Sequence, residues 1–409
     1  MRILIQDYGG YPFPLQLSEA LSLRGHVVVH LHFADLQKVK AGAMAGSFVN
    51  GNLTVVGLSL GEPFQKYNLF RRRQQELCYA ELAQDEIRTR GPEVVLSAGA
   101  PLEVQSRLAA AAQAAGAEFY FWMQDVNSAA VQKLLPKRLP IVGHLYGWYQ
   151  EYLERRLAKN SSGLVFITKD FLKLVELWGL SRERCHVIEN WAPLETIAPD
   201  GAAQRWAAKH GLQGKRLLLY SGTLGMKHNP GLLLKLAEGL ATTHSDAQVV
   251  VVSFGPGVDY LQKESAARGL RNLTTLGFQP IEEFPHMLGA ATVLLAILES
   301  SASEYSVPSK VLSYLCAARP IVLSVPLDNL ASRIVMEHQA GLAAEPTDEA
   351  GFVAAAQQLL DDPEMQRRCA WNGRQYAEKT FDIQVIADRF EAVFGLQKEQ
   401  RAKGFSAAG

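Results

Sequence analysis

A glycine-containing loop with a single lysine follows a short apolar run in the middle of the chain. The run, residues 217–220, predicts a buried strand, and the loop 221–227 leads into a predicted helix over residues 230–240. Glycine lets a backbone approach an anion closely, a helix start offers unpaired N–H groups, and lysine adds a charge. Gly222 and Lys227 are therefore candidate phosphate ligands, although an ordinary turn with a surface lysine has the same pattern.

A second loop carries two more glycines. Gly255 and Gly257 follow the apolar run 248–253. Because glycine has no side chain, a flat base or a sugar can lie against the backbone there. An ordinary glycine turn is the alternative, and the sequence leaves both readings open.

A third loop, residues 306–310, opens a predicted helix over residues 309–318, with Ser309 as its expected N-cap. Lys310 lies at the positive end of that helix, where the helix dipole disfavours a cation. We therefore expect Lys310 either to meet an anion or to point to water. With Lys227, it would give a diphosphate two point charges at two helix starts.

Two loops of the first half carry glycine or polar residues. Gly9 and Gly10 follow the first apolar run, but their spacing is not that of a dinucleotide fingerprint. Gln124 and Asp125 follow the predicted strand 119–123. Asp125 has three open roles: to orient a hydroxyl, to act as a base, or to cap a helix.

Short apolar runs alternate with longer helical patterns, and this series occurs twice. Such alternation predicts parallel sheets covered on both faces, and near-continuous apolar strands fit burial on both sides. We predict an α/β fold with two Rossmann-like, doubly wound parallel-sheet domains facing a cleft, with ligands at the carboxyl ends of the strands. The expected strands are residues 2–5, 27–32, 53–57, 94–97, 119–123, 163–167, 186–188, 216–220, 248–254, 273–276, 293–297 and 321–324.

The domain boundaries follow from composition. We expect a first domain over residues 1–191, a linker rich in Pro, Ala and Gly over 192–201, and a second domain over 202–380. An amphipathic helix and a polar tail fill residues 381–409, with the helix packing back toward the first domain. The expected helices include residues 14–24, 74–89, 102–115, 145–159 and 169–177.

Composition excludes several classes of protein. The 409 residues hold 41 basic and 41 acidic side chains, which gives no reason to expect a nucleic acid as a partner. The four cysteines are far apart and lack metal spacing, so we expect no disulfide and no structural metal, and they suit a reducing compartment. The N-terminal apolar run is too short for a signal peptide, and no run approaches the roughly 20 apolar residues of a membrane span.

We therefore expect a cytoplasmic protein. Contact with an anionic membrane at its periphery stays open, because two stretches mix basic and apolar residues. A solvated face is the other reading of both stretches. Their basic residues are Arg71, Arg72, Arg73, Lys133, Lys137 and Arg138.

The chain resembles the retaining glycosyltransferases of the GT-B fold, in the large group called family 4, and among them bacterial capsule, colanic-acid and O-antigen enzymes. The resemblance covers most of the chain and depends on the order of its motifs. These are Tyr8-Gly9-Gly10, Arg24-Gly25-His26, Trp122-Met123-Gln124-Asp125, Ile188-Glu189-Asn190-Trp191, Gly222 with Lys227, Pro308-Ser309-Lys310, and residues 314–322.

The resemblance implies a role for each candidate residue. Lys227, Lys310 and Asp125 would be catalytic, and Gly9, Gly10, Gln124 and Asp125 would lie on the acceptor side. The donor nucleotide would contact Gly222, Thr223, Lys227, Gly255, Gly257, Ser306, Pro308, Ser309, Lys310 and Ser313. Three residues depart from the family, which often has arginine at Thr223, histidine at Gln124 and glutamate at Ser313.

The resemblance also implies a mechanism. A UDP- or GDP-linked sugar binds the second domain, and lysines rather than a metal stabilise the leaving diphosphate. A glycan or lipid-linked acceptor binds the first domain, and the leaving phosphate takes its proton, with no other cofactor needed. Three alternatives stay open: a catalytically inactive nucleotide-sugar scaffold, a GT-B sugar epimerase, and an α/β protein that binds no nucleotide sugar.

Overall fold

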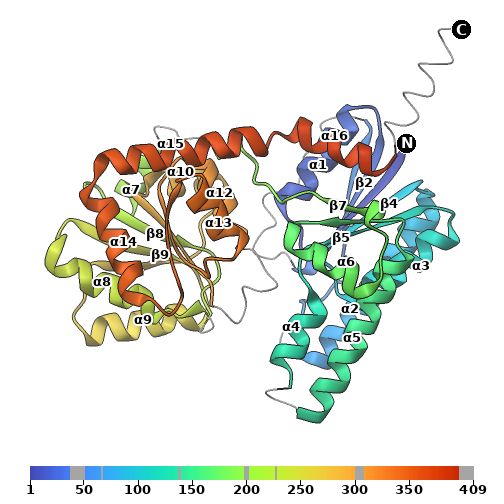
Figure 1. Cartoon of the computed structure of the whole chain (residues 1–409), viewed down its shortest axis with the longest axis horizontal. Coiled ribbons are helices and arrows are strands. Elements are labelled where there is room, and N and C mark those ends of the chain that lie inside the picture. The colour runs from blue at the N-terminus through green and yellow to red at the C-terminus, as the bar shows by residue number, and fades with distance from the viewer. Residues whose placement is uncertain are drawn as a thin grey trace, which may run out of the picture. The chain divides into compact units, whose positions relative to one another are not determined.

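The computed structural model describes residues 1–36, 51–65, 68–136, 140–197, 202–225, 228–299 and 308–395. They form two compact units (Figure 1). The first unit comprises Met1–Asn190 and the chain from Ile383 onward, and the second comprises Trp191–Asp382. Among the described helices, none combines the length and the apolarity needed to cross a membrane.

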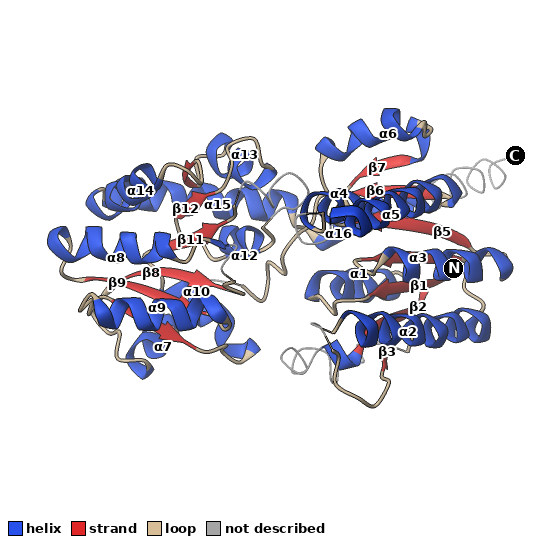
Figure 2. Cartoon of the chain, turned by 90° about the horizontal axis from the view of Figure 1, so that it is seen from below, coloured by secondary structure: helices blue, strands red, loops and turns tan. Residues whose placement is uncertain are grey.

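The first unit is built on a parallel sheet of seven strands in the order β3-β2-β1-β4-β5-β6-β7. Helices cover both of its faces (Figure 2). The strands are β1 (Arg2–Asp7), β2 (Val27–Phe33), β3 (Leu53–Leu58), β4 (Val94–Ala98), β5 (Glu118–Met123), β6 (Gly163–Phe166) and β7 (Cys185–Val187). The helices are α1 (Pro12–Leu23), α2 (Leu69–Arg90), α3 (Leu102–Ala114), α4 (Asn127–Leu134), α5 (Pro140–Asn160), α6 (Lys173–Trp178) and α16 (Ile383–Val393).

The second unit is built on a parallel sheet of six strands in the order β10-β9-β8-β11-β12-β13. The strands are β8 (Arg216–Ser221), β9 (Ala247–Val252), β10 (Leu273–Leu276), β11 (Val293–Ile297), β12 (Ile321–Ser324) and β13 (Gly341–Ala344). The helices are α7 (Ala203–Lys209), α8 (Gly231–Thr243), α9 (Pro256–Ala267), α10 (Phe284–Ala290), α12 (Lys310–Cys316), α13 (Leu330–Glu337), α14 (Glu349–Asp361) and α15 (Pro363–Thr380).

Each sheet has a point at which the strand order reverses. In the second sheet β8 pairs with both β9 and β11, so the loops that leave β8 and β11 run to opposite sides of the sheet. In the first sheet β1 occupies the same position between β2 and β4. Ligands of doubly wound sheets bind beside such a reversal, at the carboxyl ends of the strands. The predicted α/β fold class, with two domains each built on a parallel sheet, is confirmed.

The expected linker differs from the structure in its packing. Ala192 and Ile197 of this segment are buried, and the carbonyl of Ile197 accepts a hydrogen bond from Arg374 of α15. The segment that composition marks as a spacer is therefore packed against the second unit in its described part. Residues 198–201 lie outside the described residues.

Candidate functional site

The loop after β8 bends sharply at a glycine. Gly222 has a φ of +111°, which L side chains rarely adopt, and its N–H donates to the carbonyl of Val252 at the end of β9. Thr223 is exposed, and its carbonyl accepts a hydrogen bond from the Tyr220 hydroxyl. Glycine therefore permits the sharp bend with which the chain leaves β8 at the strand reversal.

Lys310, at the start of α12, reaches this loop from the other side of the reversal. Its Nζ lies 3.6 Å from the centroid of the Tyr220 ring, and a Cβ atom built on Gly222 would lie 3.3 Å from that nitrogen. Among the described residues, no carboxylate forms an ion pair with it. Burial lowers the pKa of Lys310 to about 7. The sequence offered an anion or water as its partner, and the structure places its ammonium over an aromatic ring.

A buried tyrosine joins the two loops below Lys310. The Tyr314 hydroxyl accepts a hydrogen bond from the N–H of Ser221 at 3.0 Å and donates to the carbonyl of Leu295 at 3.2 Å. It therefore ties α12 to the ends of β8 and β11. Burial, opposed by its hydrogen bonds to Ser221, raises the pKa of Tyr314 to about 12, so the phenol stays protonated and acts as a positioning group. Sequence reasoning singled out Ser313 and missed its neighbour.

The glycines after β9 complete the arrangement. The N–H of Gly257 donates to the carbonyl of Leu224 at 3.1 Å, and a Cβ on Gly257 would lie only 2.4 Å from that oxygen. Gly255 has a φ of +103° and lies against the same carbonyl. Close packing of two loops thus requires Gly257, whereas Gly255 permits the turn into α9. The structure therefore brings Gly222, Thr223, Gly255, Gly257 and Lys310 together at one edge of the sheet.

The structure describes only some of the remaining residues that we expected to contact the donor. Lys227 and Ser306 lie outside the described residues. Ser309 occupies the N-cap position of α12, as expected, but its backbone is helical and its side chain makes no capping hydrogen bond. Pro308 and Ser313 are half-buried beside it.

Two aromatic residues at this edge escaped the sequence reasoning. Phe254, directly after β9, and Phe278, after β10, form an edge-to-face pair with ring centroids 4.5 Å apart. They keep 48% and 41% of their surface exposed. An exposed aromatic pair beside Gly255 offers a stacking surface to a flat ring. Phe254 could have been recognised from the sequence, because a large apolar residue directly before a glycine-proline turn has no obvious role in a core.

In the first unit, Asp7 at the end of β1 binds the backbone N–H groups of the glycine loop that follows it. The buried carboxylate of Asp7 accepts hydrogen bonds from the N–H groups of Gly9, at 3.2 Å, and Tyr11. Gly10 has a φ of +61°, and its N–H donates to the carbonyl of Asp7. These backbone donors are already used, so this loop is not an anion site in the described conformation.

Gln124 and Asp125 follow β5 as expected, in two different environments. Gln124 exchanges amide hydrogen bonds with Asn190, of 2.6 and 3.4 Å, while Asp125 is exposed. Burial, with the Asp7 and Asp125 carboxylates, raises the pKa of Tyr11, which places Asp125 near the Gly9–Gly10 loop.

A carboxylate from another helix accepts hydrogen bonds from the first N–H groups of α4. The Glu154 carboxylate of α5 accepts hydrogen bonds from the N–H groups of Asn127, at 3.0 Å, and Ser128, at 3.2 Å. Burial is the largest influence and raises the pKa of Glu154 to about 7. No sequence signal marked this residue, because its role depends on the packing of α4 against α5.

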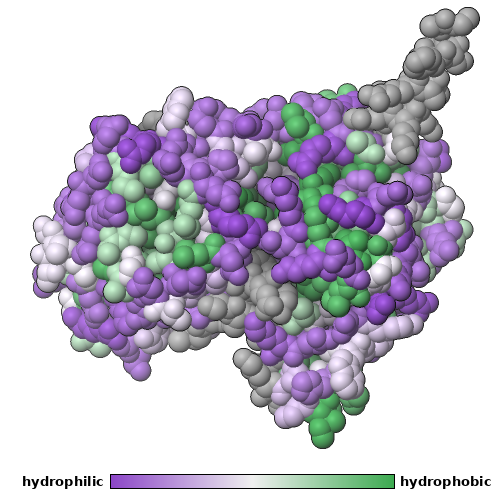
Figure 3. All heavy atoms as spheres, viewed as in Figure 1, coloured by the Kyte–Doolittle hydropathy of each residue, from purple (hydrophilic) through white to green (hydrophobic). Residues whose placement is uncertain are grey.

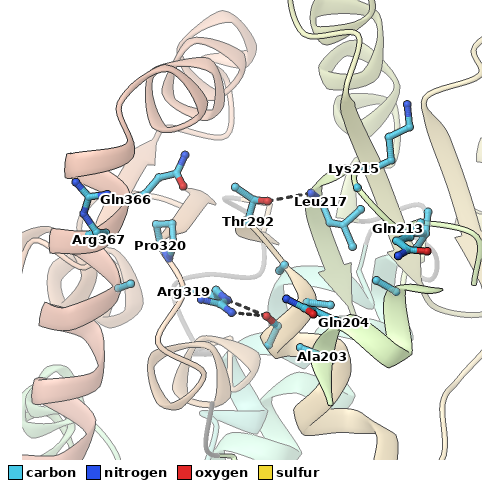
Figure 4. Close-up of a pocket in the computed structure, with 17 residues that line it drawn as sticks. Ala203, Gln204, Gln213, Lys215, Leu217, Thr292, Arg319, Pro320, Gln366 and Arg367 are labelled. Carbon is cyan, nitrogen blue, oxygen red and sulfur yellow. Dashed lines mark hydrogen bonds between the residues drawn. The ribbon is translucent and has the colours of Figure 1, made fainter. Parts of the chain in front are cut away.

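A cavity lies elsewhere in the second unit. It has a volume of about 800 Å³ and is lined by residues at the amino ends of the strands, among them Leu217, Thr292 and Pro320 (Figure 4). Arg319 donates two hydrogen bonds to the carbonyl of Gly289 at its wall. Because the candidate loops leave the carboxyl ends, this cavity belongs to the opposite edge of the sheet and is not part of the candidate site.

Within the described part of the chain, no cluster of three or more His, Cys, Asp or Glu side chains has the arrangement of a metal site. The four cysteines, Cys78, Cys185, Cys316 and Cys369, are free thiols.

Sequence comparison places a family match in the second unit and finds relatives over about six tenths of the chain. Residues 203–376 match the family model of the glycosyl transferases group 1. The alpha-D-kanosaminyltransferase of Streptomyces kanamyceticus is 25% identical over 250 residues, which are 60% of this chain and 63% of that protein. A glycogen synthase of Mycobacterium tuberculosis is 26% identical over 261 residues, which are 62% of this chain and 60% of that protein. The chain thus spans about six tenths of the length of these curated relatives.

Comparison of structures covers nearly the whole chain. HepE of Anabaena, in complex with UDP and glucose, has a TM-score of 0.70 at 14% identity and covers 97% of this chain and 99% of its own. A sucrose-phosphate synthase from Thermosynechococcus elongatus has a TM-score of 0.72 at 16% identity and covers 100% of both chains. The chain therefore has the GT-B fold, and its residues 203–376 match the group 1 glycosyl transferases.

Proposed function

We propose that this chain is a glycosyltransferase that moves a sugar from a nucleotide-diphosphate sugar to a glycan or lipid-linked acceptor. The observation that carries the proposal is Lys310. Its ammonium is held over Gly222 at the strand reversal, inside the segment that matches the group 1 glycosyl transferases, and no described carboxylate neutralises it. A half-buried cation without a counter-ion is stabilised when an anion such as a diphosphate binds beside it.

The groups around Lys310 suggest how a donor would bind. The diphosphate would meet Lys310, Lys227 and the backbone of the Gly222 loop, and the Phe254–Phe278 pair would face the flat base. Charge that develops on the leaving diphosphate would be stabilised by the lysines, without a metal. HepE has been crystallised with UDP and with UDP-glucose, so we propose UDP as the first nucleotide to test.

The finer parts of the proposal come from the family resemblance. We propose transfer with retention, in the manner of family 4, and a role in bacterial cell-surface polysaccharide synthesis such as capsule or O-antigen assembly. The acceptor would lie on the first unit, beside Gly9, Gly10, Gln124 and Asp125. Asp125 is exposed and so accessible to an acceptor hydroxyl. Free thiols fit the reducing cytoplasm, where nucleotide sugars are made.

Thermal stability with added nucleotides tests the proposal. A ligand at 100 times its Kd adds about 2.7 kcal/mol to the stability of the native state. We expect one nucleoside diphosphate among UDP, GDP and ADP to raise the Tm of the wild type. Lys227→Ala and Lys310→Met should lose that rise, and Lys263→Ala, an exposed lysine on α9, should keep it.

Two outcomes would contradict the proposal. Full sugar transfer by both lysine variants, with a donor that still saturates, would show that these lysines do not hold the diphosphate. Binding of a nucleotide sugar without turnover, across a panel of glycan and lipid-linked acceptors, would instead support an inactive nucleotide-sugar scaffold.

A further inference from the structure

The first half of helix α5 has its small and polar residues inside and its large apolar residues outside. The residues that it buries in its first half are Gly143, Gly147 and Gln150. Ordinary surface helices bury an apolar stripe and expose polar residues. The arrangement of α5 is the reverse over its first three turns, so its outer face is not explained by the core of the first unit.

Close packing against α4 explains the glycines. A Cβ on Gly143 would lie 2.7 Å from the backbone nitrogen of Pro136, and a Cβ on Gly147 would lie 2.7 Å from Cγ of Gln132. Two glycines four residues apart stand on one face of a helix, so α4 approaches that face more closely than any side chain would allow. The inner face of α5 is thus occupied, and its large side chains are left outside.

The outer face carries a continuous apolar surface. At 100° per residue its large side chains fall within one broad arc of the helix. Figure 3 shows the hydrophobic atoms at the free tip of the α4–α5 hairpin, at the bottom of the view. The exposed members are Ile141, Val142, Leu145, Tyr146, Trp148, Tyr149 and Tyr152, and Ile141 keeps 78% of its surface exposed.

The same arc becomes basic toward the end of the helix. Arg155, Arg156 and Lys159 are exposed, and none of them forms an ion pair with a residue that the structure describes. The arginines of α2 differ, because Arg71, Arg72 and Arg73 pair with Glu62, Glu76 and Glu103. The basic stretch of α2 that suggested membrane contact is therefore neutralised, whereas these three residues of α5 are not.

We infer that this outer face of α5 docks on an anionic lipid surface. Aliphatic side chains at the tip would enter the boundary between headgroups and acyl chains, and tyrosine and tryptophan suit the headgroup level because they are apolar with a polar edge. Arg155, Arg156 and Lys159 would meet anionic headgroups. The inference goes beyond the proposed sugar transfer and does not depend on it.

Flotation of the full chain with vesicles tests the inference. We expect binding to phosphatidylcholine vesicles that contain phosphatidylglycerol, and weaker binding to phosphatidylcholine alone. The double variant Leu145→Gln, Trp148→Gln should lose about tenfold in affinity, since it removes apolar area from the face. Arg156→Gln with Lys159→Gln should lose roughly thirtyfold on anionic vesicles only, at about 1 kcal/mol for each charge.

The chain offers a matched control. Leu177 and Trp371 are 68% and 65% exposed, against 59% for Leu145 and 63% for Trp148, and they lie on α6 and α15. Leu177→Gln with Trp371→Gln should bind vesicles as the wild type does. All six substitutions are at exposed positions, and circular dichroism checks that each variant is folded.

Three results would overturn the inference. The first is wild-type protein that stays unbound with anionic vesicles at low salt. The second is equal loss in the α5 pair and the control pair. The third is a dimer in solution without lipid that Leu145→Gln, Trp148→Gln abolishes, which would make the face an interface between two copies. The assay uses neither donor nor acceptor, so its failure leaves the proposed transfer untouched, and failure of the nucleotide test leaves the docking face standing.

Discussion

Lys310 shows what a sequence can and cannot indicate about a single residue. Its position in a loop before a helix made it a candidate for anion binding. Its place over the Tyr220 ring and beside Gly222 depends on the pairing of β8 with β11, which brings together residues about 90 positions apart. No local pattern contains that pairing. The same reason hid Tyr314, whose hydroxyl contacts Ser221 across the reversal.

The pKa of Lys310 predicts how nucleotide binding depends on pH. In the free protein the ammonium has a pKa of about 7, because burial disfavours the charge. A bound diphosphate favours the charged form and raises that pKa. Above pH 7, binding must therefore take up a proton, and the Kd for UDP should rise by up to about tenfold per pH unit. Below pH 7 Lys310 is already protonated in the free protein, so its protonation should hardly change the Kd.

Calorimetric titration of UDP between pH 6 and pH 9 measures this dependence. Lys310→Arg is the informative variant, since a guanidinium stays charged throughout this range. It should remove the rise in Kd, whereas Lys263→Arg on α9 should leave it in place. A flat profile for the wild type would mean that Lys310 does not carry its charge to the diphosphate.

At the scale of elements, apolar periodicity predicted most strands but placed the starts of two helices too late in the chain. The expected helix over residues 145–159 begins at Pro140 in the structure, and the one over residues 74–89 begins at Leu69. Both misplaced starts carry exposed apolar residues, such as Ile141 and Phe70, which break the pattern of an amphipathic helix. Periodicity assumes that apolar residues face the core, and it fails where they face outward.

Strand β13 was missed for a different reason. Its sequence, Gly341–Ala344, has no β-branched or aromatic residue and so lacks a strand signal. A Cβ on Gly341 would lie 1.9 Å from the carbonyl oxygen of Ile321, so glycine is required for β13 to pair with β12 at this position. Gly341 therefore allows β13 to form, and it is also one reason why the sequence does not predict a strand there.

The glycine face of α5 predicts different effects for two similar substitutions. In Gly143→Ala, the new Cβ would meet the backbone of Leu135 and Pro136 within 2.8 Å. Backbone atoms cannot rotate away from the new methyl group as a side chain can. We therefore expect the free energy of unfolding to fall by about 1–3 kcal/mol, although alanine improves the helix propensity by about 1 kcal/mol. In Gly147→Ala the nearest atom is a side-chain atom, Cγ of Gln132 at 2.7 Å, and the nearest backbone atom, Cα of Gln132, is 3.3 Å away, so the two effects should nearly cancel.

Hydrogen exchange measured on the two variants separates these cases. In Gly143→Ala the amides of α4 should exchange faster than in the wild type, and in Gly147→Ala they should change little. Equal acceleration in both variants would mean that the backbone of α4 yields as easily as the Gln132 side chain, and that the close packing is not specific to Gly143.

At the scale of the whole molecule, the chain leaves the first unit and returns to it. The ring of Phe390 on α16 packs edge-to-face on Trp122 of β5 at 5.0 Å between centroids, and Phe394 packs in the same way on Tyr120 at 5.1 Å. Arg24, after α1, forms ion pairs with Asp388 and Glu391. The amphipathic pattern of residues 383–394 predicted the helix, while its contacts with β5 and α1 required the structure.

This return predicts that a substitution near the C-terminus destabilises the first unit alone. Phe390 is fully buried, and Phe390→Ala should lower the free energy of unfolding of the first unit by about 3–5 kcal/mol. Exchange should then accelerate in β5 and α1, and not in β8 and β9, because no described part of α16 belongs to the second unit. Val385→Ala, at a half-exposed position of the same helix, is the control and should change neither unit. Equal acceleration in both units would show that α16 stabilises the molecule through more than its contacts with the first unit.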